Sequence, residues 1–250
     1  MTRHRWLSRI SAAAACCLAA GALSQSDTLV VAAFSAQQPG AALPDAWKPT
    51  SVSSAKNTTR YTLVEDGGVT VVRAESSAAA SGLSRNIKVN STEFPILKWR
   101  WKISNILKAS DIRSRNGDDY PARVYVMFDY PLEKLPFAER TKIRMARALH
   151  DPNLPTATLC YVWDSKAPVA TIIPSSYTDR VRMVVVESGA SRVNQWLAIE
   201  RDVAADFKAA FGEDAPPITA VAIATDTDNT GESVVSHYGD ISFNKHKVTK

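Results

Sequence analysis

The chain has 250 residues, with 30 lysines and arginines against 25 acids, a formal net charge of +5 and three cysteines. The charges of both signs are mixed along the sequence, which excludes the concentrated basic stripe of a nucleic-acid-binding protein. Part of the positive charge belongs to the N-terminus, where Arg3, Arg5 and Arg9 precede an apolar, alanine-rich run from Ile10 to Leu23.

This N-terminal pattern predicts a secretory signal peptide over residues 1–22. The small residues Ala20-Gly21-Ala22 place the cleavage after Ala22, and the mature protein in the periplasm or outside the cell. The apolar run is shorter than the roughly 20 residues that span a bilayer, so we expect no membrane span. The alternatives are a membrane anchor and a lipid anchor on Cys16 or Cys17. Only Cys160 follows the signal, which excludes an intramolecular disulfide.

Short apolar or alternating runs separated by turn residues fill residues 23–250 and predict a single β-sandwich domain. The clearest turn is Asp66-Gly67-Gly68, because Asp-Gly between two β-branched runs is a strong hairpin signal. In chain order, the expected strands are Thr28–Phe34, Thr59–Val64, Val69–Ala74, Leu83–Val89, Ile96–Ile103, Arg123–Asp129, Ala157–Trp163, Arg180–Glu187, Trp196–Val203, Ile218–Thr225 and Tyr238–Phe243.

Two short helices interrupt the expected strands. Phe137–His150 has apolar residues near helical spacing and lies in an insert over residues 132–155. Asp202–Phe211 begins with an acid and ends at Gly212, as helices commonly do. The predicted fold class is therefore mainly β, a jelly-roll-like, galactose-binding-like sandwich with one or two short helices.

Four of the expected strands combine an apolar face with a face that carries arginine, lysine or an aromatic side chain. If these strands share one sheet, their polar positions converge on a surface suited to a sugar, a carboxylate or a peptide. The alternative is a solvated face with ordinary cross-strand charge pairs. Trp99 and Trp101 alternate with aliphatic residues and are expected in the core. The predicted ligand-binding residues are Arg100, Arg123, Tyr125, Arg182, Trp196 and Glu200.

Two acidic loops are further candidates. Asp118 and Asp119 precede the Arg123 strand, where they could bind a ligand or a cation, or pair with Arg123. The second loop, residues 226–231, starts like an EF-hand loop, but its twelfth position is a histidine instead of the required glutamate. The predicted metal ligands are Asp226, Asp228 and Thr230, holding a structural calcium, and the alternative is a tight Asx turn. No nucleophile elbow, zinc-protease motif, P-loop or dinucleotide glycine pattern is present.

Several motifs recur in a fixed order along the mature chain: Ser81–Arg85, Pro95–Trp101, Asp118–Val126, Tyr161–Trp163, Glu200–Val203, Phe211–Gly212, Asp226–Gly231 and Tyr238–Ile241. In this order the chain resembles the bacterial secreted family catalogued as domain of unknown function 3047 (DUF3047). The insert from Leu132 to Pro155 is longer than the family pattern. The resemblance implies a secreted protein and no particular activity. The strand Tyr238–Phe243 also looks like the last strand of jelly-roll carbohydrate-binding modules, which often carry a structural calcium away from the sugar face.

Three functions are compatible with these features. The first is a non-catalytic binding module for a glycan or another small polar ligand. The second is a hydrolase of envelope polysaccharide that uses Asp118, Asp119 or Glu200 as an acid–base pair. The third is a protein-interaction subunit that uses the basic segment from Arg140 to Arg147.

Overall fold

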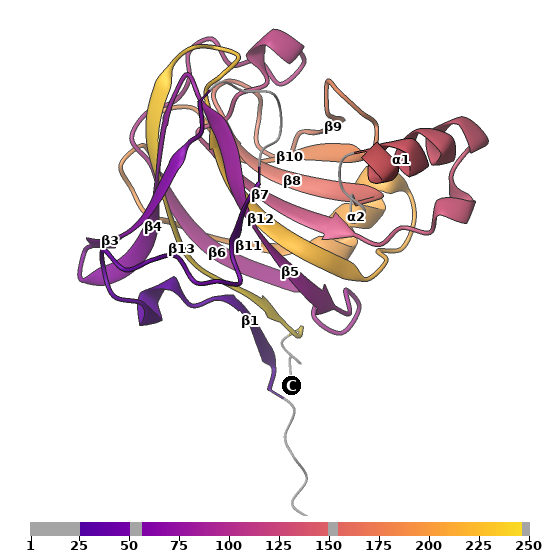
Figure 1. The fold of residues 1–250 in the computed structure, drawn as a ribbon, viewed down its shortest axis with the longest axis horizontal. Helices are drawn as coiled ribbons and strands as arrows, with labels where there is room; N and C mark the ends of the chain where they lie inside the picture. Colours follow the sequence, from indigo (N-terminus) through magenta and orange to yellow (C-terminus); the bar gives the residue numbers. More distant parts are fainter. Residues whose placement is uncertain (1–25, 51–56, 150–154, 247–250) are drawn as a thin grey trace, which may run out of the picture.

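A computed structural model describes residues 26–50, 57–149 and 155–246 and shows two β-sheets that face each other (Figure 1). The expected signal peptide, residues 1–22, lies outside the described residues. The elements in chain order are β1 (Thr28–Ala32), η1 (Phe34–Ala36), β2 (Lys48–Thr50), β3 (Arg60–Asp66), β4 (Val69–Ser77), β5 (Ala80–Val89), β6 (Ile96–Ile103), η2 (Arg115–Gly117), β7 (Ala122–Phe128), η3 (Leu132–Lys134), α1 (Phe137–Leu149), β8 (Ala157–Asp164), β9 (Ile172–Pro174), β10 (Val181–Ser188), β11 (Leu197–Asp202), α2 (Val203–Phe211), β12 (Ile218–Asp226) and β13 (Ser233–Asn244).

The strands are divided between two sheets in a jelly-roll-like order. Sheet A has the order β11-β6-β13-β4-β3, and β1 pairs with the end of β13 beyond β4. Sheet B has the order β2-β5-β12-β7-β8-β10-β9. The consecutive pairs β4–β5, β6–β7 and β12–β13 each cross from one sheet to the other. This arrangement confirms the predicted mainly β sandwich, and β2 and β9, of three residues each, are the strands that the prediction omitted.

Side chains alternate between the two faces of each strand, and the apolar ones on the inner faces form the core between the sheets. Trp99 and Trp101 of β6 are 3% and 0% exposed, which confirms that they pack inside. Their rings contact aromatic rings of sheet B, with centroids 5.3 Å apart for Trp99 and Tyr161, and 6.3 Å apart for Trp101 and Trp163. These large rings bridge the two sheets directly, and burying them contributes much of the apolar stabilisation.

A smaller apolar cluster covers the opposite, outer face of sheet B. It contains Cys160, whose thiol is fully buried. Burial raises the pKa of Cys160 to about 12, so this thiol is a poor nucleophile at neutral pH. The other buried members are Ile112, Tyr120, Val162, Met183 and Val185.

The two helices form where the sequence predicts them. In α2, the Asp202 carboxylate accepts a hydrogen bond from the N–H of Ala205 at 2.9 Å, and Gly212 closes the helix at φ 78°. Gly212 therefore adopts the left-handed conformation that favours glycine. Helix α1 follows the predicted segment as far as Leu149, and residue 150 lies outside the described residues. Among the described residues, no helix is long and apolar enough to cross a membrane.

Candidate functional site

The polar positions predicted on one surface lie on different surfaces. Strands β6 and β11 are neighbours in sheet A, whereas β7 and β10 belong to sheet B, so the predicted convergence is wrong. Arg100, Trp196 and Glu200 lie on the outer face of sheet A, where Ala198 and Glu200 pair with Arg100 and Lys98. Arg123 and Tyr125 lie on the outer face of sheet B, and Arg182 lies on the inner face of sheet B with Val184.

On the outer face of sheet A, the half-buried ring of Trp196 is surrounded by polar groups. The Arg100 guanidinium lies 4.6 Å from the ring centroid, and the Lys102 ammonium lies 5.3 Å from it. The indole N–H donates to Asp66 Oδ1 at 3.4 Å, and the His237 ring lies 6.2 Å away, edge-on. Cations over an indole face are attracted by its quadrupole, so these contacts fix the orientation of Trp196.

Gly239 of β13 leaves the space that Arg100 occupies. A Cβ at position 239 would lie 2.5 Å from both Cγ and Nε of Arg100. The arginine stem therefore crosses the sheet over a bare backbone and brings its guanidinium to Trp196.

The charged groups around this ring are partly neutralised by one another. Lys98 pairs with Glu200 at 2.8 Å, and Lys102 pairs with Asp66. Burial acts to raise the pKa of Asp66, but hydrogen bonds from Lys102 and Trp196 outweigh it and hold the pKa below its ordinary value. Burial and the Lys102 charge lower the pKa of His237, so its imidazole is neutral at pH 7.

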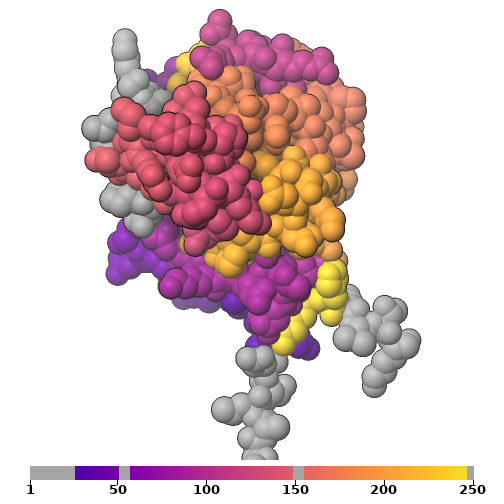
Figure 2. Space-filling view, turned by 90° about the vertical axis from the view of Figure 1, so that its right-hand side faces the viewer, coloured from indigo at the N-terminus to yellow at the C-terminus, as the bar shows by residue number. Residues whose placement is uncertain are grey.

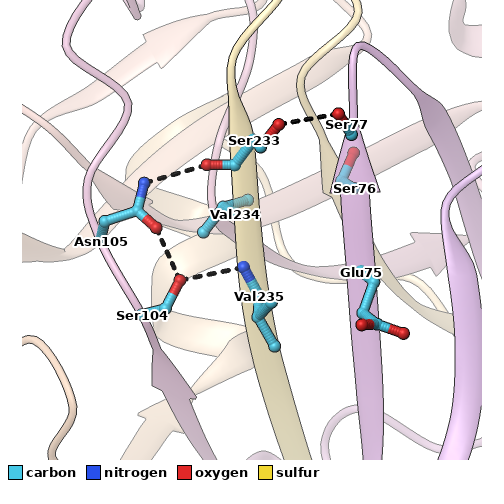
Figure 3. Close-up of a pocket in the computed structure, with 8 residues that line it drawn as sticks. All are labelled: Glu75, Ser76, Ser77, Ser104, Asn105, Ser233, Val234 and Val235. Carbon is cyan, nitrogen blue, oxygen red and sulfur yellow. Dashed lines mark hydrogen bonds between the residues drawn. The ribbon is translucent and has the colours of Figure 1, made fainter.

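Two polar hollows lie at either end of this group along β6 and β13. One, of about 350 Å³, is lined by Glu75, Ser77, Ser104, Asn105 and Ser233 together with Ser76, Val234 and Val235 (Figure 3). Its hydroxyl and amide groups are already ordered, since Ser104 accepts from the N–H of Val235 at 3.0 Å and Ser233 donates to Ser77 at 2.8 Å. The other, of about 400 Å³, is lined by Lys98, Trp99, Arg100, Ala198, Ile199, Glu200, Asp240 and Ser242.

On sheet B, Arg123 is buried in a compact polar cluster. Its Nε donates to Asp226 Oδ1 at 2.9 Å, and its two terminal nitrogens contact Asp226, the backbone oxygen of Asp118 and the Tyr125 hydroxyl. Its guanidinium also lies 4.3 Å from the Tyr120 ring centroid. Arg123 is only 4% exposed, so it is not available to a ligand at the surface.

Burial raises the pKa values of two carboxylates of this cluster, those of Asp226 and Asp118. Burial raises the pKa of Asp226 to about 7, against the opposing effect of the Arg123 charge. Burial likewise raises the pKa of Asp118, which Arg123 approaches to 3.7 Å.

The loop after β12 is fastened by Asp119. The Asp119 carboxylate accepts from the backbone N–H of Thr230 at 2.6 Å and from the side-chain amide of Asn229 at 3.2 Å. Carboxylate oxygens of Asp119, Asp226 and Asp228 lie within 4.8 Å of one another, so Asp119 lies with two of the predicted metal ligands. The third predicted ligand, Thr230, is not part of this group and donates its backbone N–H to Asp119. Oxygen donors suit calcium, but Asp226 already binds a cation in the Arg123 guanidinium. The calcium site stays a prediction.

Among the acids proposed as a catalytic pair, Glu200 lies away from Asp118 and Asp119. Asp118 and Asp119 belong to the loop before β7 and contact Arg123 and the 229–230 backbone, whereas Glu200 pairs with Lys98 on the outer face of sheet A.

The sequence prediction also missed Asp66 and His237 beside Trp196. Neither has a local signal, because each reaches Trp196 from a different strand.

Comparisons with known proteins give a family and a set of distant folds. No curated protein matches the chain. One solved structure that resembles it is a family 29 carbohydrate-binding module, with 12% identity, coverage of 88% of this chain and 92% of that chain, and a TM-score of 0.34. Another is a family 30 carbohydrate-binding module of a Clostridium thermocellum cellulase, with 9% identity, coverage of 88% of this chain and 98% of that chain, and a TM-score of 0.40. The Emp47p carbohydrate recognition domain is similar at 8% identity, with 88% and 96% coverage and a TM-score of 0.41.

The Endo-D glycoside hydrolase domain from Streptococcus pneumoniae R6 also matches at 12% identity and a TM-score of 0.34. The match covers 80% of this chain, which spans only 22% of that structure. A family model described as a protein of unknown function, DUF3047, matches residues 45–242. Because this match extends over most of the sequence, the chain belongs to the DUF3047 family.

Proposed function

We propose that the protein is a non-catalytic binding module that holds a glycan along the outer face of sheet A. The observation that carries this proposal is the ring of Trp196, held between two polar hollows. The chain advances six residues along β6 and just beyond it, from Lys98 at one hollow to Ser104 at the other, a distance of about 20 Å at about 3.3 Å per residue. The surface between the two hollows, here called the track, has a length that suits an extended polar chain.

The chemistry of the track also favours a glycan. A sugar presents hydroxyl groups at its edges and apolar C–H faces, which match the serine-lined hollow, the charged groups of the second hollow and the indole ring. The fork of Arg100 is not engaged in an ion pair among the described residues, so it offers donors to hydroxyl or carboxylate groups of the ligand.

A glycan array followed by isothermal titration calorimetry tests this function. Trp196→Ala and Arg100→Gln are each expected to weaken the best glycan at least about tenfold, since central aromatic and arginine side chains dominate binding energies. Tyr177 and Arg115 are a matched control, because they form a similar ring–arginine pair, 5.3 Å apart, on a loop of sheet B. Tyr177→Ala should leave the affinity unchanged. Equal losses in the Trp196 and Tyr177 variants would contradict the proposed site.

A second candidate is a protein-interaction subunit that uses α1. Phe137 and Met145 on this helix are 76% and 59% exposed, beside the exposed cations Lys142 and Arg144. In Figure 2 the atoms of α1 lie on the face of the molecule that is turned toward the viewer. A partner with an acidic and apolar surface would complement this face.

Site-specific photo-crosslinking distinguishes this candidate. A photoreactive amino acid at position 145 should give one discrete adduct in cells that produce the protein. The same group at Val169, which is 55% exposed on a sheet B loop, is the control. Adducts that are identical at both positions would exclude a specific α1 interface.

The signal-like residues 1–22 support a proposed location in the periplasm or outside the cell. N-terminal sequencing of the protein recovered from a periplasmic extract should begin at residue 23. A protein retained in the cytoplasm with residue 1 intact would refute this location.

A further inference from the structure

Two arginines, Arg180 and Arg182, lie together at the end of the sandwich that α1 and α2 cover, and a third comes from α1. Arg182 belongs to β10 and lies on its inner face, and Arg180 immediately precedes the strand. Arg140 comes from α1. Figure 1 shows α1 and α2 beside this end of β8 and β10.

Aromatic rings and one backbone carbonyl hold these arginines in place. The Arg180 guanidinium lies 4.7 Å from the Tyr130 ring and 5.3 Å from the Phe211 ring, and the Arg182 guanidinium also lies 5.3 Å from Phe211. The Nε of Arg180 donates to the backbone oxygen of Thr156 at 2.7 Å. Two guanidinium groups therefore share one aromatic ring, although like charges repel.

Each arginine keeps a buried donor without an acceptor. Among the described residues, no hydrogen-bond partner lies near Arg140 Nε, Arg180 Nη2 or Arg182 Nε, although all three atoms are inaccessible to solvent. Leaving a buried donor unpaired destabilises the folded protein, and more so when the group is charged. Unpaired donors on two arginines that share the Phe211 ring are unusual, because buried polar groups are nearly always paired.

The neighbouring acids do not neutralise these cations. Within the described ranges, none of the three arginines forms an ion pair within 4.0 Å, and Glu213 accepts instead from the Tyr130 hydroxyl at 2.7 Å and lies 3.6 Å from Lys134. Burial lowers the pKa of Arg180, and the more distant charges of Glu139 and Glu213 oppose this effect without outweighing it.

We infer that Arg180 and Arg182 form a binding site for an oxyanion group, a phosphate or a carboxylate, on a small ligand. Arginine forks match the geometry of these groups with paired, charge-assisted hydrogen bonds. The Tyr130 and Phe211 rings would contact the uncharged remainder of the ligand. The site is separate from the outer face of sheet A, so it does not depend on the proposed glycan function.

Thermal unfolding with inorganic phosphate and with glucuronate, each compared with sodium chloride at equal ionic strength, tests the site and distinguishes the two ligand groups. A specific anion should raise the melting temperature in a saturable way, since a ligand that binds only the folded state stabilises it. Arg182→Met should weaken the anion at least about tenfold, because it removes a charge-assisted fork. Arg113, an exposed loop arginine, provides the control Arg113→Met, which should bind as the parent does.

A second readout separates a ligand site from a structural role. In anion-free buffer, Arg182→Met should keep or raise the melting temperature, because it removes an unpaired buried donor. A structural arginine would instead lower it on substitution. Arg182→Lys, which keeps the charge without the fork, should bind the anion more weakly than the parent. No stabilisation by either anion beyond chloride, or an equal response in the Arg182→Met protein, would overturn the inference.

Discussion

Arg123 and Asp226 join the neighbouring strands β7 and β12 through a two-point ion pair. The Nε of Arg123 donates to Asp226 Oδ1 at 2.9 Å, and a terminal nitrogen contacts Oδ2. Asp226 Oδ1 also accepts from the N–H of Tyr120 at 3.0 Å, so the pair ties the loop before β7 to the end of β12. The loop that looked like a metal site in the sequence is thus bound by the protein's own cation.

Arg123→Leu should destabilise the fold by about 3–5 kcal/mol at pH 8, because it leaves a buried carboxylate without its partner. Urea unfolding followed by circular dichroism measures this loss. The double variant Arg123→Leu with Asp226→Leu should recover part of it, since both charges are then absent. A loss below about 1 kcal/mol in the single variant would show that the pair contributes little.

The raised pKa of Asp226 predicts a stability that falls as pH rises. Burial sets this pKa near 7 in the folded protein, against an ordinary value of about 3.9 in the unfolded chain. Between these values the folded state binds more protons, so its stability decreases from about pH 4 to about pH 7. Asp118 and Asp228 have pKa values raised in the same direction. Urea unfolding from pH 4.5 to 8 should show a smaller slope in Asp226→Asn, and an identical slope would contradict the assignment.

Gly239→Ala should displace Arg100 from Trp196 with little change in stability. The added Cβ occupies the space of the arginine stem, but that stem is flexible and can move outward. The indole N–H resonance of Trp196 reports the change directly by nuclear magnetic resonance, without any ligand. An unshifted Trp196 resonance in Gly239→Ala would refute the contact.

Cys160 should be unreactive in the folded protein. Its pKa of about 12 reduces the thiolate fraction at pH 8 by about a thousandfold or more relative to a free cysteine, and burial blocks access. In the chain that starts after residue 22, Cys160 is the single cysteine, so a thiol-specific dye reports it alone. The dye should react at once in urea and hardly at all in buffer. Rapid labelling of folded protein would mean that the outer cluster of sheet B opens readily.

Local patterns predicted the elements that depend on local physics. The alternation around Trp99 and Trp101 indicated their burial, and Asp202 and Gly212 marked the two ends of α2. These signals succeed because the alternation of a strand and the caps of a helix depend only on residues that are close in the sequence.

The site was only partly predictable because sheet membership is not local. Alternation shows which side chains of one strand share a face, but it does not show which sheet that strand joins. Arg100 and Arg123 therefore looked like neighbours, although β6 and β7 cross from one sheet to the other. For the same reason, Asp66 and His237 could not be linked with Trp196 before their strands were placed in sheet A.

We expect the fold to form even when the loop between β12 and β13 is interrupted. Its position is set from outside, since Asp119 holds the backbone of Thr230 and the side chain of Asn229. Gly231, which follows, is exposed and has open space around it. The chain should therefore tolerate a cut, an inserted peptide or new termini at Gly231, because the contacts that align the two sheets there do not require an unbroken loop.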